Sequence, residues 1–363
     1  MRLENRTILI TSNEPWGDVW YSKHNYANEL AKDNDVIFID PPGRWRPAAL
    51  AGAAPVLLPI SPQLHVLRYR NVLPALNMAL FRLNNRIVSR AIRMLLRSTG
   101  RKENLLLAFD PFRLVDPAQL DAERSAFFAV DAHVMTTLGE RCIYRNVDKI
   151  INISPALNER YLPFGKPMLT LDHAIPADQF GTKPKPTGHA GHGLFVGNLD
   201  ARLDLPFIRR MAETFPNVPF VFIGPYALHG RPEADLLFRS GAFRNVHHHD
   251  SVPFKELGGY IADASFCLAP LNVQDPRNAI SHHKIFHYLA LGKPVFSPVF
   301  SAYLPIADLL YMNNDADALL AQLAEFLRQG EAPELTAKRI SFARTRTYDH
   351  NLAAIANFLL APK

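Results

Sequence analysis

Short apolar runs alternate with helix-period segments along nearly the whole chain, and this alternation limits the possible folds more than any other feature. The first half contains six apolar runs with polar boundaries, which we expect to be strands: Thr7–Thr11, Asp35–Asp40, Leu64–Tyr69, Leu105–Phe109, Ala126–Val130 and Lys149–Ile153. The second half contains five more, near residues 193–197, 218–223, 244–248, 265–270 and 294–297. Such runs are typical of buried parallel strands. The alternation therefore predicts two doubly wound α/β domains.

The length of 363 residues suits two domains, each able to bury its own core. The segment 181–193 is rich in glycine and proline and is interpreted as the interdomain linker. We therefore expect an N-terminal domain at 1–180 and a C-terminal domain at 194–347. The run Pro47–Ile60 is interrupted by prolines and is expected to be a loop.

Cysteine and hydropathy patterns restrict the compartment. The chain has two cysteines, Cys142 and Cys267, each inside an apolar segment, so a disulfide framework or a zinc site is not expected. No run of about 20 apolar residues is present, as a membrane-spanning helix would require. The first residues also lack the apolar region of a signal peptide. We expect a cytoplasmic protein.

The net charge of +6 is unevenly distributed, because the interval between Asp40 and Glu103 contains no acidic residue. A helical pattern at Leu76–Thr99 lies in this interval. Six arginines recur there at helical spacing and fall within an arc of about 100°: Arg82, Arg86, Arg90, Arg93, Arg97 and Arg101. Such a stripe favours an anionic membrane surface. The alternative is a packed helix with a solvated basic face.

The segment Asn278–Pro298 has the pattern of a polar loop, a helix near 282–291, a Gly-Lys-Pro turn and a buried strand. Gly292 is suited to the left-handed conformation that ends a helix. Lys284 then lies in the first turn, where free N–H groups and the helix dipole favour an anion. An ordinary helix with a solvated lysine is the alternative interpretation.

The stretch from Lys284 to Val295, Lys-Ile-Phe-His-Tyr-Leu-Ala-Leu-Gly-Lys-Pro-Val, resembles the donor-site helix of GT-B glycosyltransferases of the broad family-4 type. The segments that resemble the preceding strands of the donor domain, in the expected order, are Gly193–Leu199, Phe215–Pro225, Asn245–Leu257 and Ala264–Pro270. The likeness covers roughly residues 190–300. It implies two Rossmann-like domains facing across a cleft, with a last helix at 348–361 packing back on the N-terminal domain.

The resemblance also implies donor-binding residues, which are expected to hold the nucleotide and its diphosphate: Gly197, Asn198, Arg202, Gly224, His283, Lys284 and His287. His287 stands where many members have glutamate, and Ala279 replaces a second glutamate of retaining members. This departure is similar to the xanthan-type membrane-associated glucuronosyltransferase and favours an inverting mechanism.

An inverting mechanism requires a carboxylate base from the N-terminal domain. Asp131 follows an expected strand and is the first candidate, with Asp110 and His133 as rivals and helix capping as the structural alternative. The aromatic loop after the first strand is expected to contact the acceptor through five residues: Trp16, Gly17, Asp18, Lys23 and His24.

The expected function is metal-independent transfer of a hexosyl or glucuronosyl group from a UDP- or GDP-type nucleotide sugar, without a cofactor. The acceptor is expected to be a lipid-linked or growing saccharide in cell-surface polysaccharide synthesis, at the inner face of the cell membrane. A nucleotide-sugar epimerase and a non-catalytic binding protein are the alternatives. Neither metal binding by His247–His249 nor nucleic-acid binding is expected.

Overall fold

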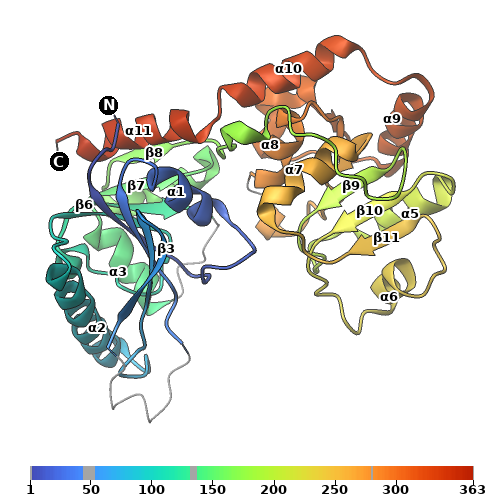
Figure 1. Ribbon diagram of the computed structural model, residues 1–363. Helices are drawn as coiled ribbons and strands as arrows, with labels where there is room; N and C mark the ends of the chain where they lie inside the picture. Colours follow the sequence, from blue (N-terminus) through green and yellow to red (C-terminus); the bar gives the residue numbers. More distant parts are fainter. Residues whose placement is uncertain (1, 44–53, 131–136, 279–280, 363) are drawn as a thin grey trace. The chain divides into compact units, whose positions relative to one another are not determined.

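The computed structural model of the chain describes residues 2–43, 54–130, 137–278 and 281–362 (Figure 1). The chain forms two compact units. The N-terminal unit consists of Met1–Leu171 and Tyr348–Lys363, and the C-terminal unit consists of Asp172–Thr347. Both units contain a sheet of mainly parallel strands with helices between them, as the alternation in the sequence predicts.

The N-terminal unit is built on an eight-stranded sheet with the order β3-β4-β2-β1-β5-β6-β7-β8. The strands are β1 (Thr7–Thr11), β2 (Asp35–Ile39), β3 (Val56–Ser61), β4 (Leu64–Arg68), β5 (Asn104–Ala108), β6 (Ala122–Ala129), β7 (Lys149–Asn152) and β8 (Met168–Thr170). All neighbouring pairs are parallel except β3 and β4. The strand order reverses between β1 and β5, and the carboxyl ends of strands at such a point commonly form ligand sites.

The N-terminal unit also contains α1 (Ser22–Leu30), α2 (Met78–Ser98), α3 (Leu138–Asn146), α4 (Asn158–Tyr161) and α11 (Tyr348–Leu360). The last helix, α11, returns to this unit from the end of the chain, close to α1 and β6. Asn351 donates to the Tyr26 hydroxyl at 2.9 Å, and Lys149 Nζ donates to the Phe358 and Ala361 carbonyls at 2.5 and 2.9 Å. The lysine thus supplies charge to the negative end of the helix dipole.

The edge strand β3 corrects the expected loop at Pro47–Ile60. Val56–Ser61 pairs antiparallel with β4, and the register shifts between Pro59 and Ser61. A proline is tolerated there because an edge strand leaves one row of N–H groups unpaired, and a bulge relieves the register. The rest of the expected loop, up to residue 53, lies outside the described residues.

The C-terminal unit is built on a six-stranded parallel sheet with the order β11-β10-β9-β12-β13-β14. The strands are β9 (Gly193–Val196), β10 (Phe220–Ile223), β11 (Val246–His249), β12 (Phe266–Leu268), β13 (Val295–Ser297) and β14 (Tyr311–Met312). The helices are α5 (Leu205–Thr214), α6 (Pro232–Phe238), α7 (Phe254–Asp263), α8 (His283–Ala290), α9 (Ala316–Gln329) and α10 (Pro333–Arg344). The order is that of a dinucleotide-type Rossmann sheet, and it reverses between β9 and β12.

The boundary between the units lies earlier in the chain than the sequence predicts. Residues 172–193 belong to the C-terminal unit, whereas 172–180 were expected in the N-terminal domain and 181–193 in a linker. The Lys185 N–H donates to the Gly259 carbonyl at 2.9 Å, and the Thr187 N–H donates to the Asp263 carboxylate at 2.9 Å. The glycine- and proline-rich segment is therefore hydrogen-bonded to α7 and is not a separate linker.

Candidate functional site

Two glycines follow the carboxyl ends of adjacent strands in the C-terminal unit, so no side chain projects from the backbone at these two positions. Gly197 follows β9 with φ +144°, and Gly224 follows β10 with φ +148°. The Gly197 N–H donates to Ile223 O at 2.9 Å, and a Cβ at Gly224 would strike the Gly197 carbonyl oxygen. Only glycine fits these conformations and this contact. The missing side chain of Gly197 thus leaves room for another group to approach the backbone at the end of β9.

Lys284 lies in the first turn of α8 and points to this glycine edge. Its Nζ atom is 3.9 Å from the centre of the Phe195 ring, and a Cβ built on Gly197 would lie 2.5 Å from Nζ. In the described part of the chain no carboxylate or carbonyl group bonds this ammonium. Burial and the nearby charge of Arg202 lower the pKa of Lys284 to about 7, although Asp200 opposes the shift. An anion at this edge would supply the missing counter-charge.

Arg202, by contrast, already has an acidic partner. Its Nε and Nη2 atoms donate to the two oxygens of Asp200 at 3.0 and 2.8 Å. Burial alone would favour the neutral acid, but the bonds from Arg202 lower the pKa of Asp200. Asn198 is exposed in the same turn. The turn thus places a neutralised Arg–Asp pair beside Lys284, and Lys284 carries the local positive charge.

The histidines of α8 bind the start of the C-terminal unit to that helix. His283 Nε2 lies 3.0 Å from the Ala174 carbonyl and 3.1 Å from His287 Nε2, and His287 Nδ1 contacts the Gln179 side-chain oxygen. His173 Nε2 in turn lies 3.1 Å from the Ser281 carbonyl. These contacts fit neutral rings in which His283 Nε2–H and His287 Nδ1–H donate. Burial lowers the pKa of all three histidines, that of His173 to about 3.

This network changes the interpretation of His287. The family resemblance placed His287 at the ribose hydroxyls, but its two ring nitrogens contact Gln179 and His283, and the residue is 4% exposed. Its contacts therefore show a structural role, with no nitrogen left for a ribose. Sequence reasoning missed Gln179, because nothing in a lone glutamine near a chain turn indicates a histidine partner 108 positions away.

The predicted acceptor loop divides into a surface part and a buried part. Gly17 and Asp18 are exposed. Trp16 is partly exposed, and its backbone N–H donates to Asp40 Oδ1 at 2.8 Å. Lys23 is buried against Asn13 and Glu14. These contacts hold the loop in place and leave three of the five predicted residues at the surface.

His24, the fifth residue, is fully buried. Its Nε2 lies 3.1 Å from the Pro15 carbonyl, and its Nδ1 accepts the Tyr21 N–H at 3.1 Å. The first bond requires Nε2–H, so the ring is neutral with a fixed tautomer. Burial lowers the pKa of His24 to about 4, although the hydrogen bond to the Pro15 carbonyl opposes this shift. His24 therefore fastens the loop to its helix.

The predicted base Asp131 and its rival His133 lie outside the described residues, as does Ala279. Asp110, the other rival, follows β5 beside the point where the strand order reverses. It is buried, and its oxygens accept the Phe112 N–H and Arg113 Nη1, each at 2.7 Å. Burial raises the pKa of Asp110, although Arg113 opposes the shift. With both oxygens engaged, Asp110 acts as an anchor for Arg113.

The six arginines of the basic stripe separate into two groups. Arg97 is bonded to Asp121 at 2.6 and 2.9 Å, Arg93 lies 3.9 Å from the same carboxylate, and Arg101 is bonded to Asp35 at 2.6 and 3.0 Å. No acidic partner from the described segments reaches Arg82, Arg86 or Arg90, and all three are exposed. Two acids from other elements, Asp121 and Asp35, thus pair with three of the six arginines.

No described group of histidine, cysteine and acidic side chains has the arrangement of a metal site. In the His247–His249 run, the His247 ring instead stacks on His189 with centres 3.8 Å apart. No described helix is long and apolar enough to cross a membrane.

The fold is shared with solved structures over nearly the full length of the chain. A glycosyltransferase from Rickettsia africae aligns with a TM-score of 0.67 at 11% identity, over 99% of this chain and 100% of that chain. An α,α-trehalose-phosphate synthase (UDP-forming) from Burkholderia vietnamiensis aligns with a TM-score of 0.69 at 13% identity, over 99% and 97%. Trehalose-6-phosphate synthase OtsA aligns with a TM-score of 0.69 at 11% identity, over 99% of this chain and 100% of that chain.

The chain has the GT-B fold. At these identities the similarity establishes the architecture and not the substrates. The sequence matches no protein-family model and no curated protein. Within the GT-B fold, the C-terminal unit brings together Gly197, Gly224, Lys284 and the Arg202–Asp200 pair. The partners that anchor the predicted residues, Phe195, Gln179 and Asp200, could not be identified from the sequence.

Proposed function

We propose that this protein is a glycosyltransferase that uses a nucleotide-sugar donor bound at the Lys284 edge of the C-terminal unit. The observation that carries the proposal is a half-buried ammonium, without an acidic partner in the described structure, beside a glycine edge of a Rossmann sheet. Departure of a nucleoside diphosphate develops negative charge at the leaving oxygen. A fixed cation in a poorly solvated site stabilises that charge in the transition state.

The donor is proposed to be of the UDP or GDP type, and the transfer to need neither metal nor cofactor. A similar structure from E. coli contains UDP-2-fluoro glucose, which supports a sugar nucleotide as the ligand class. The transferred group is a hexosyl or glucuronosyl residue. The glucuronosyl variant rests only on the motif resemblance around Lys284.

The proposed mechanism is inverting, with Asp131 as the base that takes the proton of the acceptor hydroxyl. The base must be a free carboxylate, and Asp110 does not meet this condition, because its oxygens bond Phe112 and Arg113. A similar trehalose-6-phosphate synthase is described as transferring with retention. Determining the anomeric configuration of the product distinguishes the two routes.

The acceptor is proposed to be a lipid-linked saccharide of a cell-surface polysaccharide, reached at the inner face of the cell membrane. Helix α2 supports this part. Arg82, Arg86 and Arg90 are exposed beside Leu83 and Ile87, which are 46% and 41% exposed. Basic side chains next to exposed apolar ones suit an anionic lipid surface.

Lys284→Ala tests the enzymatic proposal. The variant should lose about 100-fold or more in transfer or donor hydrolysis, the scale of one electrostatic stabiliser. Lys338→Ala removes an exposed lysine of α10 from the same unit and should retain full rate. An isomerised nucleotide sugar as the product would indicate an epimerase, and donor binding without turnover would indicate a binding protein.

A further inference from the structure

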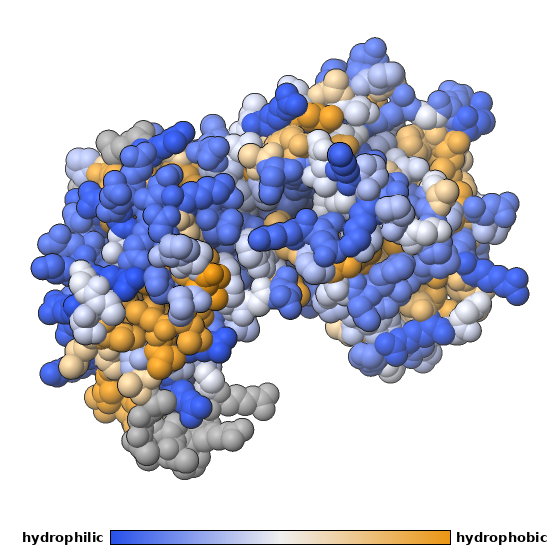
Figure 2. Space-filling view, viewed as in Figure 1, coloured by the Kyte–Doolittle hydropathy of each residue, from blue (hydrophilic) through white to orange (hydrophobic). Residues whose placement is uncertain are grey.

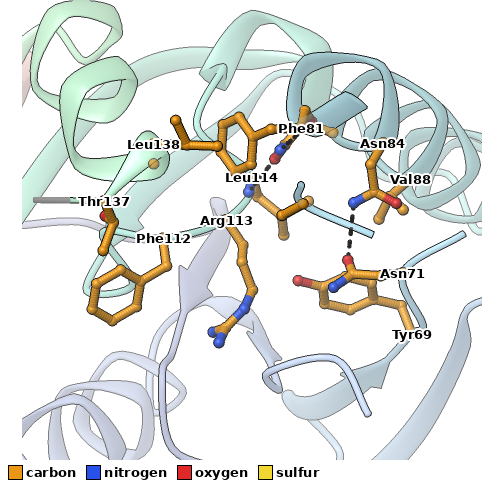
Figure 3. A pocket seen from close by; sticks show the side chains of 13 residues that line it. Tyr69, Asn71, Phe81, Asn84, Val88, Phe112, Arg113, Leu114, Thr137 and Leu138 are labelled. Carbon is orange, nitrogen blue, oxygen red and sulfur yellow. Dashed lines mark hydrogen bonds between the residues drawn. The ribbon is translucent and has the colours of Figure 1, made fainter. Parts of the chain in front are cut away.

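A cavity of about 330 Å³ lies in the N-terminal unit beneath α2 (Figure 3). Its walls come from the inner face of α2, from the segments after β4 and β5, and from the start of α3. Phe81, Val88, Leu114 and Leu138 make these walls apolar. The cavity lies at the carboxyl side of the sheet, where open α/β folds bind ligands, and its volume is in the range of ligand pockets.

The amide side chains in the cavity wall are occupied by the protein itself. Asn84 accepts the N–H groups of Val72 and Leu73, each at 2.9 Å, and donates to Asn71 at 3.0 Å. Asn85 accepts the Leu114 N–H at 2.8 Å. These bonds fix the walls and leave few polar groups for a ligand.

Two polar groups in the wall retain free capacity. Arg113 uses Nη1 to bond Asp110 at 2.7 Å and is one-third exposed, and its other guanidinium N–H groups have no partner in the described residues. Tyr69 is 7% exposed, and its hydroxyl likewise has no partner among the described residues. Figure 3 shows the two side chains next to each other, with the Tyr69 hydroxyl on the Arg113 side. A ligand group bound there must accept hydrogen bonds.

The outer side of the same helix is apolar and basic. Met94 on α2 is 62% exposed, and Leu76, which precedes the helix and follows the cavity residue Ala75, is 78% exposed. Figure 2 shows apolar side chains gathered over the part of this unit that contains β3 and the beginning of α2. An apolar surface therefore borders the cavity at the beginning of the helix.

We propose that this cavity binds the lipid end of the acceptor, with an apolar chain against Phe81, Val88 and Leu138 and its phosphate on Arg113 and Tyr69. The inference rests on the proposed function, because it assumes a lipid-linked acceptor. Guanidinium groups bind phosphate through several N–H donors at once, and the apolar walls bury the chain next to it. Helix α2 thus contacts lipid on its outer side and encloses the lipid chain on its inner side.

Titration calorimetry of the full chain with farnesyl phosphate, below the concentration at which it forms micelles, tests the assignment. The protein should bind one equivalent. Farnesol should bind about tenfold more weakly, because it lacks the charged acceptor for Arg113. Inorganic phosphate at the same concentration should neither bind measurably nor compete, since it gains nothing from the apolar walls.

Ala75→Trp and Ala79→Trp form a matched pair of variants. Both residues are exposed, but only Ala75 lines the cavity. Ala75→Trp should weaken farnesyl phosphate binding about tenfold or more by filling the entrance, and Ala79→Trp should not. Arg113→Lys should reduce the preference for the phosphate over farnesol. Failure of the wild type to bind farnesyl phosphate, or equal binding by the two tryptophan variants, would overturn the proposal. Donor binding at Lys284 is measured separately, so a failed donor site is distinguishable.

Discussion

The Lys284 ammonium lies 3.9 Å from the centre of the Phe195 ring, and the missing side chain of Gly197 leaves the space that the ammonium occupies. The ring comes from β9 and the lysine from α8, so strand and helix together position one charge. The cation–π contact orients the lysine but supplies no counter-charge. Burial of the ammonium and the nearby charge of Arg202 lower the pKa of Lys284, and an anion beside the ammonium would oppose both effects.

Gly197→Ala should disable the donor site through sterics alone. Its Cβ would come within 2.5 Å of Lys284 Nζ, so the lysine must move away from Phe195. Gly230→Ala is the control, because Gly230 also has positive φ but open space around it. Each change should cost about 1 kcal/mol of unfolding free energy from backbone strain. In thermal unfolding assays only Gly197→Ala should lose stabilisation by nucleotide sugar, and full stabilisation there would contradict the placement of the site.

Acidification should weaken the C-terminal unit through its buried histidines. The unfolded chain takes up protons on histidine near pH 6.5, whereas burial lowers the pKa of folded His173 to about 3. Between these values the unfolded state binds more protons, so stability falls as the pH drops from 6.5 toward 3. Denaturant unfolding at pH 7.5 and pH 5 measures the loss. The variant His173→Asn should show a smaller loss between the two pH values, and an unchanged loss would contradict the role of His173.

Asp110 and Asp131, the two aspartates considered as the base, should respond differently to amide substitution. Asp110→Asn removes the charge that pairs with Arg113 and should cost about 1–3 kcal/mol of unfolding free energy. Asp131→Asn should lower transfer by about 100- to 10,000-fold, as expected for loss of a general base, without lowering donor affinity. Denaturant unfolding and transfer rates measure the two effects. Full activity of Asp131→Asn would exclude it as the base.

Membrane binding should depend on the unpaired half of the arginine stripe. Replacing Arg82, Arg86 and Arg90 with glutamine should release the protein from anionic liposomes, at about 1 kcal/mol per basic residue. Replacing Lys102, Arg141 and Arg145 makes the same change in net charge on exposed residues of the same unit and should preserve binding. Sedimentation with anionic and neutral vesicles at rising salt measures this. Equal binding of both triple variants would refute a role for α2.

The sequence predicted the long regular elements well, because their signals are local. The helical pattern at Leu76–Thr99 predicted α2, whose buried side includes Phe81, Val88, Ile92 and Leu96. Gly292 ends α8 with φ +70° as predicted. Strands β8 and β14 were missed, since two or three residues carry too little periodicity. The edge strand β3 was missed because Pro59 within it and Pro55 just before it are typical of loops, and only the antiparallel pairing to β4 shows the strand.

The candidate site was predicted in part, for a similar reason. Gly197, Gly224 and Lys284 stand in local motifs, so the sequence indicated them directly. Their environment depends on long-range contacts, which a single sequence does not contain. Histidine is a common ligand-binding residue type, so His24 and His287 were predicted as site residues. In the structure, His24 Nε2 contacts the Pro15 carbonyl and His287 Nδ1 contacts the Gln179 side-chain oxygen. The cavity beneath α2 was not predicted, because Tyr69 and Arg113 meet only in the folded chain.

Calorimetric titration of the full chain with UDP and GDP, in buffers of different ionisation enthalpy, tests the central claim most directly. At pH 8 Lys284 is mostly deprotonated in the free protein, because its pKa is lowered to about 7. A bound diphosphate favours the charged form, so binding should take up close to one proton at pH 8 and much less at pH 6. Lys284→Met should weaken binding about tenfold or more and abolish the proton uptake. Absence of binding by either nucleotide, or equal affinity and proton uptake in the variant, would contradict a donor site at Lys284.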